Sequence, residues 1–135
     1  FRPRVIAVRL NIQRPFINSP RDSFVDFSRI ADELGESEAW RLALRHEGHV
    51  TNTDYWDDTF EDLTVRAVLS KRPELLREFC MPAWVLFDDE SAVRAMKANR
   101  FDGGIHAGSG ASLDSVEYKV FDEAQVIEES QWQDL

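Results

Sequence analysis

Cysteine is nearly absent from the sequence, and so are long runs of apolar residues. The single cysteine, Cys80, excludes an internal disulfide within these 135 residues, which fits a reducing compartment. No stretch approaches the roughly 20 consecutive apolar residues that a membrane-spanning helix needs. No basic segment followed by an apolar run marks a signal peptide. We therefore expect no membrane association.

Positive charge is also scarce, because 16 Lys and Arg stand against 25 Asp and Glu, for a formal net charge of −9. Nucleic-acid backbones repel such a chain on average, so we do not expect nucleic-acid binding. A hydrophobic content of 43% and a charged content of 30% are typical of a globular protein. We expect residues 1–135 to form a single domain.

The first two thirds of the sequence are dominated by helical spacing. Val5–Ile12 is rich in β-branched residues that alternate with polar ones, which predicts a strand. Pro15 and Pro20 indicate a loop after it. Apolar spacings of three and four predict helices over 24–34 (capped by Asp22 or Ser23), over 37–46, over 54–69 (capped by Thr53 or Asp54) and again after Pro73.

The last third changes in character from helical to extended. The apolar run Ala83–Phe87 fits a strand or an extended connector, and a helix capped by Asp88 or Asp89 follows. Three strands are then predicted, at Gly103–Ala107, Val116–Phe121 and Val126–Ile127, ahead of an acidic tail over 128–135. The fold class is α+β, with helices between an N-terminal strand and a C-terminal cluster of antiparallel strands.

Two histidines in the segment His46-Glu47-Gly48-His49 raise the question of a metal site. Their spacing differs from the His-Glu-x-x-His pattern of zinc proteases, and Gly48 is expected to end the helix between them. The acidic residues of segment 54–58 are near enough in sequence to add ligands, but they also suit a helix N-terminus. We interpret the segment as a solvated helix end and predict no metal site.

Three segments, in order, resemble an ADP-ribosyltransferase-like domain found in polyvalent proteins of phages and other mobile elements. Phe101-Asp102-Gly103-Gly104-Ile105 looks like that group's aromatic-Asp-Gly-Ile-Ile strand entry. The segment 117–127, Glu-Tyr-Lys-Val-Phe-Asp-Glu-Ala-Gln-Val-Ile, is similar to its Glu-Tyr-x-Val-Phe-Asp-Pro-x-Gln-Ile block. Val8–Phe16 resembles its Leu-Asn-Ile strand. Together the three segments cover about a quarter of the chain.

The resemblance implies a split β-sheet that binds NAD in a cleft. It implies that Glu117 is the catalytic carboxylate, which stabilises the ribose cation as nicotinamide leaves, since a negative charge favours a developing cation. Tyr118 and Ser115 take cofactor-binding positions. The preceding loop, rich in small residues, takes the place of a substrate-recognition turn, with Gly108, Ser109, Gly110 and Ser112 as its candidate residues.

The resemblance also bears on partners and location. The NAD-binding elements of the family lie upstream of the Leu-Asn-Ile strand, and only seven residues precede Val8 here. We expect them to come from an upstream segment or from another protein chain. The family implies a location in the host-cell cytoplasm or in the virion. A different function, a non-catalytic structural or protein-interaction module on the same fold, is the alternative.

Overall fold

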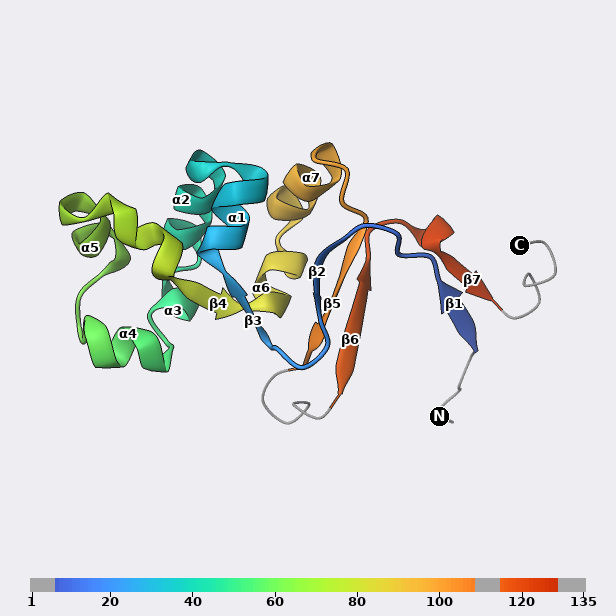
Figure 1. The fold of residues 1–135 in the computed structure, drawn as a ribbon, viewed down its shortest axis with the longest axis horizontal. Coiled ribbons are helices and arrows are strands. Elements are labelled where there is room, and N and C mark those ends of the chain that lie inside the picture. Colours follow the sequence, from blue (N-terminus) through green and yellow to red (C-terminus); the bar gives the residue numbers. More distant parts are fainter. Residues whose placement is uncertain (1–6, 109–114, 129–135) are drawn as a thin grey trace.

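The computed structural model of the protein describes residues 7–108 and 115–128, and it is a mixed α+β fold (Figure 1). The strands are β1 (Val8–Leu10), β2 (Pro15–Ser19), β3 (Phe24–Asp26), β4 (Cys80–Pro82), β5 (Gly103–Ala107), β6 (Val116–Val120) and β7 (Val126–Glu128). The helices are α1 (Phe27–Leu34), α2 (Glu36–Arg45), α3 (Glu47–Val50), α4 (Asp54–Thr59), α5 (Val65–Lys71), α6 (Ala83–Asp88) and α7 (Glu90–Ala98), with short 3₁₀ turns at Pro73–Glu78 and Glu123–Gln125. Of these helices, none is both long and apolar enough to span a bilayer.

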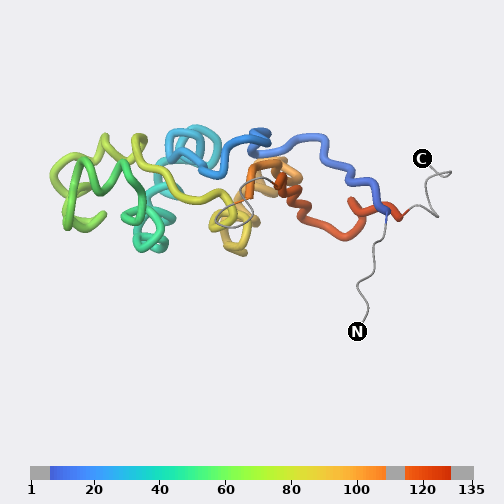
Figure 2. Tube along the Cα trace, turned by 90° about the horizontal axis from the view of Figure 1, so that it is seen from below, coloured from blue at the N-terminus to red at the C-terminus, as the bar shows by residue number. Residues whose placement is uncertain are grey.

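The strands form three small sheets. β2, β5 and β6 make a three-stranded sheet in which β5 is central, parallel to β2 and antiparallel to β6. β1 pairs with β7, and β3 pairs with β4, both antiparallel. Figures 1 and 2 show α4 and α5 at one end of the molecule and the β1–β7 ribbon at the other. The predicted antiparallel pairing is confirmed for β5 and β6, but β7 pairs with β1 in a separate sheet instead of joining them. The parallel partnership of β2 with β5 was not predicted.

The helices enclose the main core, which Trp56, Phe27 and Phe79 fill with large side chains. Phe27 packs edge-on against Phe79, and Phe79 in turn packs against Trp56. Thr53 caps α4 and Asp89 caps α7, each by accepting a main-chain N–H bond, and each is one of the two candidate caps predicted for its helix. The helix predicted over 37–46 and the helix predicted after Asp88 or Asp89 are confirmed as α2 and α7.

Two predictions near the N-terminus were wrong because tertiary pairing overrides local spacing. Pro15 begins strand β2 instead of a loop, since the first residue of a strand can lack its N–H. The helix predicted over 24–34 begins only at Phe27, after strand β3 has paired with β4. The Asp22 carboxylate accepts the N–H of Phe24, 2.9 Å away, and so supports the turn into β3 instead of a helix cap.

Two further predictions in the middle of the chain were wrong. The long helix predicted over 54–69 is two helices, because Glu61 has a positive φ of 53° and Thr64 caps α5 afresh. Ala83–Phe87, predicted as a strand or an extended connector, is helix α6. Pro82 precedes its first residue, where a missing N–H costs little.

Gln125 ties the β1–β7 ribbon to the three-stranded sheet. Its side-chain oxygen accepts the main-chain N–H groups of Phe121 and Asp122, both at 2.9 Å. Its amide nitrogen donates to the main-chain oxygens of Asn11 at 3.0 Å and Asp102 at 2.8 Å. One side chain thereby joins the segments that lead into β2, β5 and β7.

Asp102 adds further hydrogen bonds at the same junction between the β1–β7 ribbon and the three-stranded sheet. Its carboxylate oxygens accept the main-chain N–H groups of Gln13 and Arg14, both at 2.8 Å. The main-chain N–H of Asp102 donates to the Arg14 oxygen at 3.0 Å. The chain entering β2 is thus held against the chain entering β5.

We predict that Gln125→Ala lowers the free energy of unfolding by about 2 kcal/mol, because it removes four hydrogen bonds from one junction. Gln13→Ala is the matched control, since the Gln13 side chain is exposed and, among the described residues, bonds to Asn11 alone. We expect that variant to lose less than about 0.5 kcal/mol. Urea denaturation of both variants checks the difference. Equal losses would show that Gln125 does not hold the junction.

Candidate functional site

Glu117, the predicted catalytic carboxylate, lies near the start of β6. It is paired across the sheet with His106 of β5, so its side chain projects on the same face as the imidazole. Its Oε1 lies 3.1 Å from the Lys119 ammonium, two residues along the same strand. The two side chains are 34% and 25% exposed, so this ion pair is partly shielded from water.

His106 forms a buried layer beside Glu117. Its Nδ1 lies 2.8 Å from the Ala107 carbonyl oxygen, which assigns the ring proton to Nδ1. Its Nε2 is buried and has no hydrogen-bond partner among the described residues. The ring stacks on Phe87 of α6, with centroids 5.6 Å apart and planes within 8°. The side-chain layer next to Glu117 is therefore filled by packed rings.

The structure does not bring Tyr118 together with Glu117. Consecutive strand residues point to opposite faces, and Tyr118 accordingly lies on the other side of the sheet. Ser115 is exposed just ahead of β6, and its main-chain oxygen accepts the N–H of Gly108 at 2.9 Å. Gly108 is buried, whereas Ser109, Gly110 and Ser112 lie outside the described residues.

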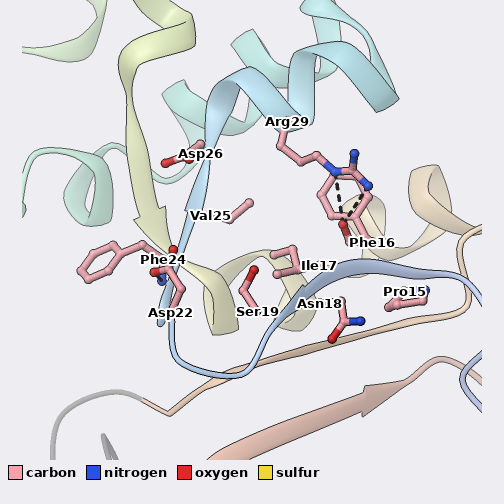
Figure 3. Close-up of a pocket in the computed structure, with 10 residues that line it drawn as sticks. All are labelled: Pro15, Phe16, Ile17, Asn18, Ser19, Asp22, Phe24, Val25, Asp26 and Arg29. Carbon is pink, nitrogen blue, oxygen red and sulfur yellow. Dashed lines mark hydrogen bonds between the residues drawn. The ribbon is translucent and has the colours of Figure 1, made fainter.

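A cavity whose walls do not include Glu117 lies between β2, β3 and α1 (Figure 3). It has a volume of about 340 Å³, within the usual range for small-molecule sites. Its polar wall carries Ser19, Asp22 and Asp26. Arg29 closes one end, where its guanidinium donates two bonds of 3.2 Å to the Phe16 oxygen and pairs with Glu33 at 3.0 Å. Sequence patterns gave no signal for this cavity.

A second cavity, of about 430 Å³, contains an acid–imidazole cluster that the sequence did not predict. The Asp89 carboxylate, only 1% exposed, accepts from His46 Nε2 at 2.6 Å and pairs with Arg45 at 3.0 Å. It also accepts from the Ser91 hydroxyl at 2.6 Å and the Ala92 N–H at 3.0 Å. One carboxylate therefore joins the end of α2 to the start of α7.

The same contacts set the charge state of Asp89. Burial alone would raise its pKa, but the bonds from Ser91, His46 and the Ala92 N–H, with the charge of Arg45, outweigh burial. The pKa of Asp89 is consequently held well below its usual range. Because His46 and Asp89 bond to each other, the segment 46–49 is a packed junction and not the solvated helix end that we predicted. Within residues 7–108 and 115–128, no three His, Cys, Asp or Glu side chains gather as metal ligands.

A third hollow, of about 330 Å³, is apolar and lies on the Tyr118 side of the sheet. Leu10, Ile12, Ile105 and Tyr118 line it. None of the three cavities includes Glu117 in its walls. Comparisons with protein-family models, with curated proteins and with solved structures find no match to this chain.

Proposed function

We propose that the chain is an ADP-ribosyltransferase-like domain, with an ADP-ribosyltransferase-like split sheet and Glu117 as its key carboxylate. The observation that carries the proposal is where the three resembling segments lie. Val8–Phe16 contributes β1 and enters β2, 101–105 enters β5, and 117–127 runs through β6 to β7. Segments about a hundred residues apart in sequence thereby pair with one another in two adjoining sheets.

The roles of two motif residues support the same proposal. Asp102 and Gln125, both part of the resembling segments, hold the junction between the two sheets through side-chain bonds to main-chain groups. Such residues suit a motif because their hydrogen bonds fix the geometry of the sheet pair. The resemblance thus coincides with the parts of the chain on which this architecture depends.

The residues around Glu117 do not by themselves fit a whole NAD molecule. Lys119 is the cation beside it, His106 and Phe87 fill the adjacent layer, and the cavities lie elsewhere. NAD would carry a pyrophosphate that needs several donors. We therefore propose that another protein chain, or a segment upstream of Phe1, holds most of the NAD, and that this chain supplies the carboxylate.

Replacing Glu117 by Gln tests the proposal. We expect release of nicotinamide from NAD, and modification of the protein itself, to fall by at least about 100-fold, since the charge that favours the ribose cation is lost. Glu123→Gln is the matched control, because Glu123 lies exposed in the 3₁₀ turn between β6 and β7 and undergoes the same chemical change. The assay uses the chain and, where the gene encodes more residues ahead of Phe1, the complete product. Equal rates for both variants and the parent would rule out catalysis by Glu117.

A second candidate function, a non-catalytic interaction module of a phage virion or mobile-element protein, is favoured by the Glu117–Lys119 pair. A carboxylate already neutralised at 3.1 Å is an ordinary strand contact. NAD thermal-shift measurements separate the two candidates, because a bound ligand stabilises by RT ln(1 + [L]/Kd). A shift with NAD supports the transferase-like domain. A stable complex with another protein, whose melting temperature does not change when NAD is added, supports the interaction module.

A further inference from the structure

The strand β6 is the last strand of the three-stranded sheet (Figure 1). Within residues 7–108 and 115–128, it pairs with β5 along one edge, and no strand lies along the other. This second edge reaches solvent, since Val116 is 40% and Tyr118 is 55% exposed. An exposed strand edge presents main-chain donors and acceptors that can pair with a further strand.

Main-chain bonds near the end of β5 show which groups of β6 lie on the open edge. The Gly108 N–H donates toward β6, to the Ser115 oxygen at 2.9 Å. The Ala107 N–H points the other way and donates to the Asp22 oxygen at 2.9 Å. An antiparallel ladder alternates in this manner, so the residues of β6 opposite the even-numbered residues of β5 bond to β5. The residues that turn their N–H and C=O groups outward are Val116, Tyr118 and Val120.

The opposite edge of the sheet, at β2, is protected against strand addition. Pro15 has no N–H to offer, and the register of β2 shifts between Pro15 and Asn18. The Phe16 oxygen already accepts two bonds of 3.2 Å from Arg29. Proline and irregular register are devices that block strand edges. β6 contains no proline and pairs with β5 without a shift in register, so its edge is the open one.

An apolar hollow of about 330 Å³ adjoins this open edge. Tyr118 forms one of its walls, and the other walls come from Leu10, Ile12 and Ile105. Every second side chain of a strand added beside β6 would project on the Tyr118 face, next to this hollow. The other side chains would lie on the face of Glu117 and Lys119, which are paired at 3.1 Å.

We propose that the open edge of β6 binds an extended segment of a partner protein by strand addition, with an apolar side chain of that segment in the hollow. The outward main-chain groups select an extended backbone, because their spacing matches that of another strand. The hollow selects apolar residues at alternate positions. The net charge of −9 favours a neutral or basic segment, and it disfavours a second copy of this chain because two acidic copies repel each other.

Strand addition would leave the proposed site open. The Glu117 side chain projects from the face opposite to Tyr118, and an added strand lies beside β6 in the plane of the sheet. The inference goes beyond the proposed function and does not rest on it. Peptide binding without transferase activity, and transferase activity without peptide binding, are distinguishable outcomes.

Titration of the ¹⁵N-labelled chain with a synthetic peptide tests the proposal. The probe is a seven-residue peptide that alternates valine with threonine between terminal lysines, since both residue types favour strands. We expect saturable shifts of the amide signals of Val116–Val120. Glutamates in place of the terminal lysines should weaken binding at least about 3-fold, and tighter binding of the acidic peptide would contradict the charge preference. No binding of the lysine peptide at about 1 mM would overturn the proposal.

Methylation of alternate peptide amides tests the mode of binding. Only every second amide of an added strand points toward β6. Methylating one alternate set should therefore weaken binding at least about 10-fold, and methylating the other set should change it by less than about 3-fold. Equal effects of the two sets would overturn strand addition.

Variants of the protein test the location. Val116→Pro removes an outward N–H without removing a bond to β5, so we expect at least about 10-fold weaker peptide binding by a folded chain. Tyr118→Lys places a charge at the hollow and should weaken binding by a similar factor. Leu63→Lys is the matched control, since Leu63 is 54% exposed in the loop between α4 and α5. Circular dichroism checks folding, and equal weakening by Leu63→Lys would contradict the location. A dimer of the chain that the peptide dissociates would assign the edge to a second copy and overturn the proposed partner.

Discussion

Replacing Asp89 by Ala is expected to lower the free energy of unfolding by about 3 kcal/mol. The carboxylate is 1% exposed and accepts from Ser91, Ala92, His46 and Arg45, so the variant loses both the cap of α7 and the link to α2. The remaining cation is not stranded in the core, because Arg45 is 59% exposed. That exposure keeps the expected loss below the largest values for a broken buried ion pair.

Asp89→Asn separates the cap from the charge. Asn caps helices about as well as Asp, so this variant should lose only part of the stability, about 1–2 kcal/mol. Asp88→Ala is the control, since Asp88 is the exposed neighbour at the end of α6 and should change stability by less than about 0.5 kcal/mol. Chemical denaturation at neutral pH measures all three variants. Similar losses for Asp88→Ala and Asp89→Ala would mean that the cluster does not stabilise the fold.

Acid should erase the advantage of Asp89 over Asn. The folded state lowers the pKa of Asp89 below its unfolded value of 3.8. The unfolded state then binds the proton more readily, so the stabilisation is fully present above the unfolded pKa and is lost as pH falls through the folded one. The difference in stability between the parent and Asp89→Asn should therefore be constant near neutral pH and shrink below about pH 4. A difference that does not change with acid would contradict this linkage.

Local signals in the sequence were enough to place some elements. Thr53 and Asp89 stand directly before apolar helical spacing, and each caps its helix as one of the two candidates predicted there. The alternation of Val116–Val120 was sufficient for β6, since a period of two is specific to strands. Each of these signals lies within a few residues of the structure it specifies, and so sequence alone could identify it.

Partners far along the chain decided the elements that sequence did not place. Strand β2 depends on pairing with β5, in which Ile105 lies opposite Asn18. No local pattern around Pro15 predicts that pairing. The spacing of Phe24 and Phe27 fits a helix, yet pairing with β4 draws Phe24 into a strand. At both β2 and β3, pairing with a distant strand outweighs the local preference of the sequence.

At the candidate site, too, some features follow from local sequence and others depend on residues far away in the chain. The position of Glu117 near the start of β6, and its pairing with Lys119 two residues on, follow from strand periodicity. The buried ring of His106 next to it depends on α6, which sequence patterns predicted as extended. The hydrogen bond between Asp89 and His46 joins residues 43 positions apart in the sequence. The residues that flank either one give no pattern that predicts this bond.

Adding one methyl group at Gly104 should cost about 3 kcal/mol, because the Phe87 ring already occupies the space. A Cβ at this position would overlap that ring, with Cε1 and Cε2 only 2.7 and 2.8 Å away. The ring cannot easily swing aside, since it stacks on His106 and packs against Phe121 with centroids 6.1 Å apart. Gly48→Ala is the matched control, because a Cβ there meets no atom within 4 Å.

The double variant Gly104→Ala/Phe87→Leu identifies the cause of that loss. A smaller side chain at 87 makes room for the new methyl group, so the double variant should be more stable than the sum of the single losses predicts, by about 1 kcal/mol or more. Gly103→Ala should show no such rescue. Its Cβ would overlap the main-chain oxygen of Lys119 on β6, and trimming Phe87 does not move that strand. Denaturation of the single variants Gly104→Ala, Gly103→Ala and Phe87→Leu and of the two double variants measures the coupling. Additive losses at Gly104 would mean that Phe87 is not the obstacle. Because the Phe87 ring also stacks on His106 beside Glu117, this coupling reports directly on how tightly the layer next to the proposed carboxylate is packed.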